Sequence, residues 1–211
     1  MGSNSRFCAP SQSARDGWRR AGLASVGCVT NGVPEWDPGS VETAPVALVA
    51  GRISPEKGVH VALRAATAAG LGRLLVGAVY DRDYYEGTVK PLLKPGEMLP
   101  AMPRSRLWSV MARAAVLLAP IDWEEPYGLA AAEAQMAGCP VAGYRRGALP
   151  EVVEEGVSGS LAEPGDFEGL VTAIDEALGL DRAAVRASAR RRLSMQRSLD
   201  AYEAALAEIA G

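Results

Sequence analysis

From residue 46 onward the chain alternates short apolar runs with amphipathic stretches, and this alternation restricts the fold more than any other feature. The apolar runs end at glycine, proline or polar residues and are typical of buried parallel strands. They are Val46–Ala50, Leu74–Gly77, Val116–Pro120 and Val141–Tyr144. Helical periodicity fills the intervals, over Pro55–Ala69, Tyr84–Leu93, Ser105–Ala114 and Tyr127–Ala137. The pattern predicts an α/β fold with an open, doubly wound, Rossmann-like parallel sheet.

Both ends of the chain depart from this alternation. After Asp166 the pattern turns helical, over Phe167–Leu178, Ala183–Leu193 and Met195–Ile209, with Ser160–Ala162 as a candidate edge strand. Before residue 46 we expect a helix over Gln12–Gly22, a strand over Val26–Val33 and a linker at Asp37-Pro38-Gly39. This first segment is too short to bury a core of its own. We therefore interpret it as the tail of a preceding domain.

Composition excludes several classes of partner. The 211 residues carry 22 Lys and Arg against 25 Asp and Glu, so the net charge of −3 gives no reason to expect a nucleic-acid or membrane-surface partner. No apolar run is long enough for a membrane span, and the first residues do not resemble a signal peptide. Cys8, Cys28 and Cys139 are scattered without metal-ligand spacing, which favours reduced thiols and a cytoplasmic location.

The loop after the first predicted strand, Gly51–Gly58, carries two cations beside a helix start. Ser54 is a suitable N-cap and Pro55 suits the first helical position, while Arg52 and Lys57 flank them. A diphosphate would suit this convergence of cations and helix dipole. The alternative is an ordinary capped helix with solvated charges.

A second loop leads through Glu125-Pro126 into the helix predicted at Tyr127. The amides of Tyr127, Gly128 and Leu129 would be free donors at that helix start, and Gly128 lets a ligand approach the backbone. Glu125 is placed to accept hydrogen bonds from sugar hydroxyls, and Glu133 to bind the paired hydroxyls of a ribose. Otherwise Glu125 only complements the helix dipole, and Glu133 is a surface residue.

Other charged or titratable motifs have simpler structural explanations. Asp81-Arg82-Asp83 has the spacing of a metal-binding D-x-D but lies where helix-capping residues are expected. His60 is expected to pack or to face solvent, and the arginines from Arg182 to Arg192 to form a solvated helix face. Neither the G-x-G-x-x-G of dinucleotide oxidoreductases nor a P-loop follows a predicted strand.

Taken together, the two loops resemble the donor-binding half of retaining GT-B glycosyltransferases of the family 4 type. Glu125 and Glu133 match that family's E-x7-E signature. The resemblance continues through Gly147–Glu151 and Gly156–Gly159, and covers roughly Asn31 to Asp166. It implies that the sheet is the C-terminal half of a GT-B fold. Residues 1–40 would be a remnant of the N-terminal acceptor domain with its linker, 41–193 the nucleotide-sugar-binding domain, and 194–211 a C-terminal helix.

The resemblance also implies roles for individual residues. Arg52 and Lys57 would hold the donor diphosphate and stabilise the leaving nucleotide, while Glu125 contacts the transferred sugar. Glu133 would bind the ribose, and the amides of Gly128 and Leu129 sugar or phosphate oxygens. The segment Met98–Leu107 would line the nucleobase pocket, with Pro100 where relatives usually have glycine. The remaining residues expected to contact the donor are Gly51, Gly77, Met102, Leu107 and Tyr127.

The resulting prediction is a metal-independent glycosyltransferase donor domain with no cofactor, which binds a nucleotide diphosphate sugar as its substrate. Transfer with retention would need an acceptor bound by an N-terminal domain that residues 1–45 cannot supply, so the chain alone is expected to be poorly active or inactive. One alternative is a non-catalytic nucleotide-sugar-binding module, or one subunit of a two-chain enzyme. Another is an epimerase or phosphorylase of the same fold.

Overall fold

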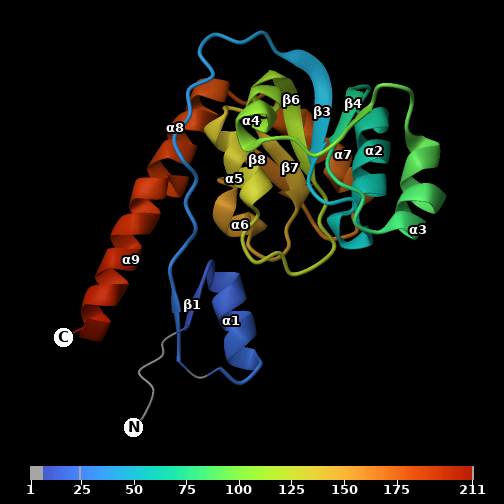
Figure 1. Ribbon diagram of the computed structural model, residues 1–211. Coiled ribbons are helices and arrows are strands. Elements are labelled where there is room, and N and C mark those ends of the chain that lie inside the picture. Colours follow the sequence, from blue (N-terminus) through green and yellow to red (C-terminus); the bar gives the residue numbers. More distant parts are fainter. Residues whose placement is uncertain (1–6, 24, 211) are drawn as a thin grey trace.

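The computed structural model describes residues 7–23 and 25–210, and its centre is a six-stranded parallel sheet (Figure 1). The strands lie in the order β5-β4-β3-β6-β7-β8 and all pair in parallel. Their bounds are β3 Ala44–Ala50, β4 Gly72–Val76, β5 Met98–Leu99, β6 Ala114–Ala119, β7 Val141–Tyr144 and β8 Gly159–Ala162. The predicted Rossmann-like α/β fold is confirmed, and β8 is the expected edge strand.

Helices cover both faces of the sheet, as the alternation requires. Helices α2 (Val59–Ala68) and α7 (Phe167–Leu178) pack together on one face. The other face carries α4 (Arg104–Arg113), α5 (Leu129–Met136), α6 (Leu149–Val152) and α8 (Arg182–Leu193). Each face therefore has its own apolar cluster. Over residues 7–23 and 25–210, no helix has the length and hydropathy needed to cross a membrane.

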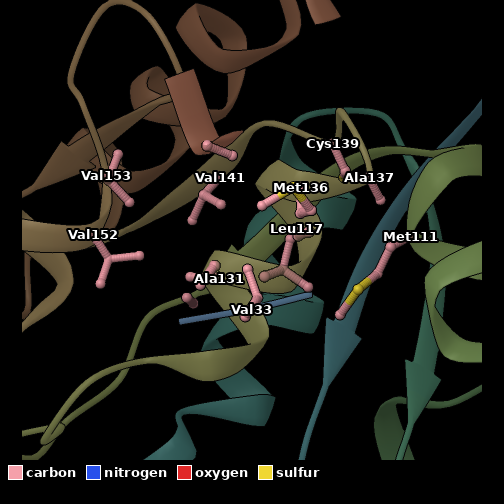
Figure 2. Close-up of a cluster of buried hydrophobic side chains, with 14 of the residues drawn as sticks. Val33, Met111, Leu117, Ala131, Met136, Ala137, Cys139, Val141, Val152 and Val153 are labelled. Carbon is pink, nitrogen blue, oxygen red and sulfur yellow. The ribbon is translucent and has the colours of Figure 1, made fainter. Parts of the chain in front are cut away.

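The cluster beneath α5 holds the site-bearing helix against the sheet. Figure 2 shows Ala131 and Met136 of α5 close to Leu117 of β6 and Val141 of β7, in the cluster that Val33 also joins. Leu117, Met136 and Val141 are at most 2% exposed. Burying such side chains contributes roughly 1.5–3 kcal/mol each. Helix α5 therefore rests on a rigid base.

The helix predicted over Pro55–Ala69 is divided in two. A 3₁₀ turn, η1 (Pro55–Lys57), ends at Gly58, whose φ of 63° lies in the left-handed region, and α2 begins at Val59. A Cβ atom at Gly58 would lie 2.0 Å from the carbonyl oxygen of Pro120. The glycine thus lets the Lys57 turn approach the end of β6 closely.

Two further segments differ from the predicted elements. The stretch predicted as one helix over Tyr84–Leu93 consists of three short turns: α3 (Arg82–Tyr84), the π-helical η2 (Tyr85–Val89) and the 3₁₀ turn η3 (Lys90–Leu92). Strand β5 was not predicted, because two residues between Pro95-Gly96 and Pro100 carry no readable alternation. The start of the expected nucleobase loop is therefore paired with β4.

The N-terminal segment forms a small unit of its own, at the bottom of Figure 1. Strands β1 (Phe7–Ala9) and β2 (Val26–Cys28) pair in parallel beside α1 (Gln12–Arg20), so the predicted helix and a shorter version of the predicted strand are confirmed. Glu151 of α6 accepts hydrogen bonds from the backbone N–H groups of Gln12 and Ser13, at 2.8 and 2.7 Å. Helix α9 (Met195–Ala210) also reaches this unit, where Ser198 Oγ donates to the carbonyl of Thr30.

The arginines of α8 do more than form the solvated face predicted for them. Arg182 donates to the carbonyls of Ala112 and Ala114, at 2.8 and 2.9 Å, and so ties α8 to the junction of α4 and β6. Arg186 pairs with Asp37 of the linker at 2.8 Å. These contacts are structural, because they satisfy backbone carbonyls and position the linker.

Candidate functional site

The candidate site is a cavity of about 400 Å³ at the carboxyl ends of β3 and β6. These strands are neighbours, but the chain continues from β3 toward β4 and β5, and from β6 toward β7 and β8. Their carboxyl ends therefore form the point where open α/β sheets characteristically bind ligands. Predicted site residues on its wall are Gly51, Arg52, Lys57, Glu125, Gly128 and Leu129, and apolar residues of β3 and β6 complete it.

Lys57 and Glu125 form an ion pair in this cavity, although 68 residues separate them. Their side chains are only 21% and 13% exposed. Trp123 Nε1 donates to the same carboxylate oxygen at 3.0 Å, and Lys57 Nζ lies 5.3 Å from the Trp123 ring centroid. The acid, the cation and the indole thus form one preorganised group. An incoming anion must compete with Glu125 for Lys57.

Arg52 is more loosely held, at the mouth of the cavity. Its side chain is 48% exposed, and its nearest carboxylate oxygen, on Glu56, is 3.9 Å away. The guanidinium carbon lies 4.8 Å from the ring centroid of Tyr80. Ser54 donates to Glu56 at 2.6 Å, and this bond lowers the pKa of Glu56. Arg52 can therefore turn toward a ligand at little cost.

Helix α5 begins at Leu129, two residues later than predicted, because Gly128 has a φ of 93°. The free amides of its first turn are accordingly those of Leu129, Ala130 and Ala131, which line the cavity. Glycine is suited to this left-handed position. Tyr127 is not among the cavity-lining residues.

Tyr127 lies instead on a second cavity of about 230 Å³, beside Thr30, Glu151 and Arg192. Its side chain is 5% exposed, and its hydroxyl has no hydrogen-bond partner among the described residues. Burial raises the pKa of Tyr127 to about 12. The hydroxyl is therefore neutral at physiological pH and separate from the Lys57 cavity.

Glu133 lies one turn further along α5 than Leu129 and Ala130, and only 6% of it is exposed. It is not a surface acid, because Arg104 Nε lies 2.7 Å from its Oε1. Burial raises the pKa of Glu133, and the Arg104 guanidinium and the Trp108 indole N–H oppose this. Glu133 is not among the residues that line the cavity, and its side chain meets Arg104 of α4, within the expected nucleobase segment.

The other predicted donor contacts do not line the cavity. A Cβ atom at Gly77 would lie 1.8 Å from the carbonyl oxygen of Gly51, so Gly77 supports the first loop from behind. Met102 and Leu107 are partly buried and pack against the apolar cluster under α4 and α5. Their proposed roles stay predictions.

Three residues with structural parts in the site were given no individual role there from the sequence. Trp123 holds Glu125, Arg104 pairs with Glu133, and Gly147 lies against the Glu125 backbone, where a Cβ atom would be 2.4 Å from the Glu125 nitrogen. The alternation of Trp with acids in 122–125 was a weak signal for the first. Arg104 and Gly147 act across 29 and 22 residues, and local periodicity does not encode such pairings.

A larger cavity of about 850 Å³ lies away from these groups, between residues 38–43 and α8. Its walls include Arg182 and Arg186, which are engaged with backbone carbonyls and with Asp37. Size does not make it the better candidate, since Arg182 and Arg186 hold α8 against backbone carbonyls and the linker.

Residues 35–193, which include the whole cavity, match the family of glycosyl transferases group 1. The chain belongs to this family. This group 1 glycosyl transferase chain is 35% identical over 151 residues to D-inositol 3-phosphate glycosyltransferase of Mycolicibacterium smegmatis. It is 30% identical over 187 residues to glycogen synthase of Mycobacterium tuberculosis. These alignments cover 66% and 82% of this chain but only 34% and 45% of the two relatives.

Solved glycosyltransferase structures have the same fold as this group 1 chain. AviGT4, involved in avilamycin A biosynthesis, superposes with a TM-score of 0.77 and 24% identity, over 97% of this chain and 64% of that one. Anabaena HepE, in complex with UDP and glucose, superposes with a TM-score of 0.81 and 21% identity, over 97% of this chain and 63% of that one. At such identities the likeness concerns the fold alone. The resemblance to GT-B glycosyltransferases is thereby confirmed.

Proposed function

We propose that this chain is the donor-binding part of a glycosyltransferase and binds a nucleotide diphosphate sugar in the Lys57 cavity. The observation that carries the proposal is the meeting of Arg52, Lys57 and the first turn of α5 at the switch point of the sheet. Two cations and free helix amides are the groups that bind phosphate oxygens. HepE, which shares the fold, is described in complex with UDP and with UDP-glucose.

Donor binding would rearrange the ion pair in the cavity. The diphosphate would take Lys57 from Glu125, and Arg52 would turn from the mouth to the same phosphates. Glu125 would then be free to accept hydrogen bonds from the sugar, while Trp123 Nε1 keeps the carboxylate in place. Under this proposal Gly51, Gly128 and Leu129 contact the donor through their backbones, and Glu133 binds the ribose. Gly77, Met102, Leu107 and Tyr127 remain candidate contacts.

We further propose that the reaction retains the configuration at the transferred sugar and uses no metal. Arg52 and Lys57 would stabilise the negative charge that develops on the departing nucleotide diphosphate. Fixing the sugar against Glu125 would limit its orientation for attack. The acceptor would be bound by a further domain facing the cavity, so the complete reaction needs more than the groups described here.

The direct test is calorimetric titration of the chain with UDP-, GDP- and ADP-glucose. We expect one of them to bind, and Lys57→Ala to weaken that binding by roughly 10- to 100-fold, the value of a charged hydrogen bond. Lys90→Ala is the matched control, since Lys90 pairs with Glu86 on the exposed η2–η3 segment. Absence of binding to all three donors, or equal losses in the two lysine variants, would contradict the proposal.

A further inference from the structure

Glu133 and Arg104 form an ion pair in which the two side chains differ strongly in exposure. The acid is 6% exposed, whereas the arginine side chain is 55% exposed. Arg104 is the first residue of α4 and lies within the segment Met98–Leu107 that is expected to line the nucleobase pocket. The cation therefore reaches a buried carboxylate from the solvent side, at the border between α4 and α5.

The two oxygens of the carboxylate are not equivalent. Oε1 is fully buried and lies 2.7 Å from Arg104 Nε, although no donor in the described residues makes an aligned hydrogen bond to it. Oε2 is not among the fully buried unpartnered atoms, and no described side chain makes an aligned hydrogen bond to it. Arg104 thus engages one oxygen and leaves the other available. A carboxylate oxygen without a donor is an acceptor for hydroxyl groups.

Burial favours the neutral acid and raises the pKa of Glu133, and the Arg104 guanidinium opposes this effect without cancelling it. Arg104 is the one charged group in the described residues that acts on Glu133, and the Trp108 indole N–H is the one polar group that assists it. A protonated carboxyl would accept fewer hydrogen bonds and would donate one instead. The charge of Glu133, and hence its use as a hydroxyl acceptor, depends on Arg104.

We propose that Arg104 is a positioning residue for donor recognition: it holds the Glu133 carboxylate in place and favours its ionised form, with Oε2 turned toward the ribose hydroxyls. This inference rests on the proposed function. It adds that the preference for a ribose resides in an α4–α5 pair and not in Glu133 alone. Arg104 itself stays on the solvent side and touches Oε1 throughout.

The test compares binding of UDP with binding of 2′,3′-dideoxy-UDP, which lacks both ribose hydroxyls, from pH 5 to pH 8. In the parent protein we expect UDP to bind about tenfold more tightly at pH 8, as a hydrogen bond to a charged group predicts, and this preference to decrease toward pH 5 as Glu133 takes up a proton. In Arg104→Gln the preference should be lost at a higher pH than in the parent, because the pKa of Glu133 would rise further without the guanidinium. Arg104→Lys keeps a positive charge and should restore much of the preference at low pH.

Arg113→Gln is the matched control, because Arg113 lies on the same helix outside the expected nucleobase segment, is exposed and has no ionic partner in the described part of the chain. It should behave as the parent does. A general disturbance of α4 would weaken UDP and dideoxy-UDP equally and leave their ratio unchanged. An unchanged ratio in Arg104→Gln at every pH would overturn the inference.

A second readout does not depend on nucleotide binding. Carbon NMR of the Glu133 carboxyl group should show that its pKa is higher in Arg104→Gln than in the parent or in Arg113→Gln. If this difference appears but no nucleotide binds, the proposed function and the ribose role fail, while the electrostatic coupling stands. If nucleotides bind and the pKa values are equal, only the inference about Arg104 fails.

Discussion

Glu125 and Glu133 lie on either side of one turn, yet they meet their cations in opposite ways. Glu125 faces Lys57 inside the cavity, where both side chains are mostly buried and Trp123 holds the acid. Glu133 is buried more deeply, but its cation lies on the solvent side of α4. A cation within the cavity can be exchanged for a ligand phosphate, whereas one outside can only support its acid. The Glu125 pair is thus suited to exchange of its cation with a ligand phosphate, and the Glu133 pair to holding a carboxylate in a fixed position.

The largest effect on the Lys57–Glu125 pair is expected from Gly58→Ala, which disturbs the turn that carries Lys57. The added Cβ would lie 2.0 Å from the Pro120 carbonyl oxygen, at a φ of 63°. We expect a loss of about 3 kcal/mol in the free energy of unfolding, measured by urea denaturation.

Gly70→Ala is the control for that substitution, since Gly70 has a φ of 70° and nothing within 4 Å of its Cβ position. It should lose only about 1 kcal/mol, from backbone strain alone. Equal losses in the two variants would show that close contact with β6 is unimportant.

A gentler change, Glu125→Gln, tests charge exchange directly. It frees Lys57 from a competing carboxylate, so inorganic pyrophosphate should bind about fivefold more tightly, equivalent to about 1 kcal/mol. Glu124→Gln is the control, because Glu124 is 71% exposed and faces Arg146. The measurement is calorimetric titration at fixed salt. A weaker or unchanged affinity for pyrophosphate in Glu125→Gln would argue against exchange at Lys57.

The smallest expected effect concerns the pH dependence of stability at the Glu133 pair. Burial raises the pKa of Glu133, so the folded protein keeps this proton at pH values where the unfolded chain has released it. The contribution to stability is therefore full below the unfolded pKa of 4.5 and falls as the pH rises through the folded pKa. Glu133→Gln should remove this fall. The measurement is urea unfolding of the parent and the variant at pH 4 and pH 7. If the two proteins differ in free energy of unfolding by the same amount at both pH values, the prediction is wrong.

The parts of the fold that depend on local patterning were predictable from the sequence. Helix α7 has the predicted bounds, because Asp166 caps the N–H of Gly169 and apolar residues repeat at helical spacing behind it. Strand β7 also has its predicted bounds. The order of strands and loops was enough to expect that Arg52, Lys57 and Glu125 would share one edge of the sheet.

Features set by contacts between distant segments were not predictable in this way. The break at Gly58 follows from the closeness of the Pro120 carbonyl, which no local pattern encodes. The start of α5 at Leu129 depends on the left-handed backbone of Gly128, where a helix from Tyr127 was expected. Arg104 contacts Glu133 only because α4 and α5 pack side by side.

The carboxylate of Glu151 has a consequence for the order in which the molecule folds. It caps α1 from 138 and 139 residues away, and no residue of α1, all of which the structure describes, is buried. A nine-residue helix is marginal by itself in water. We therefore expect α1 to become stable only after α6 and the sheet beneath it have formed, late in folding. Its opening afterwards leaves the six-stranded sheet intact, so the N-terminal unit can fluctuate without loss of the Lys57 cavity.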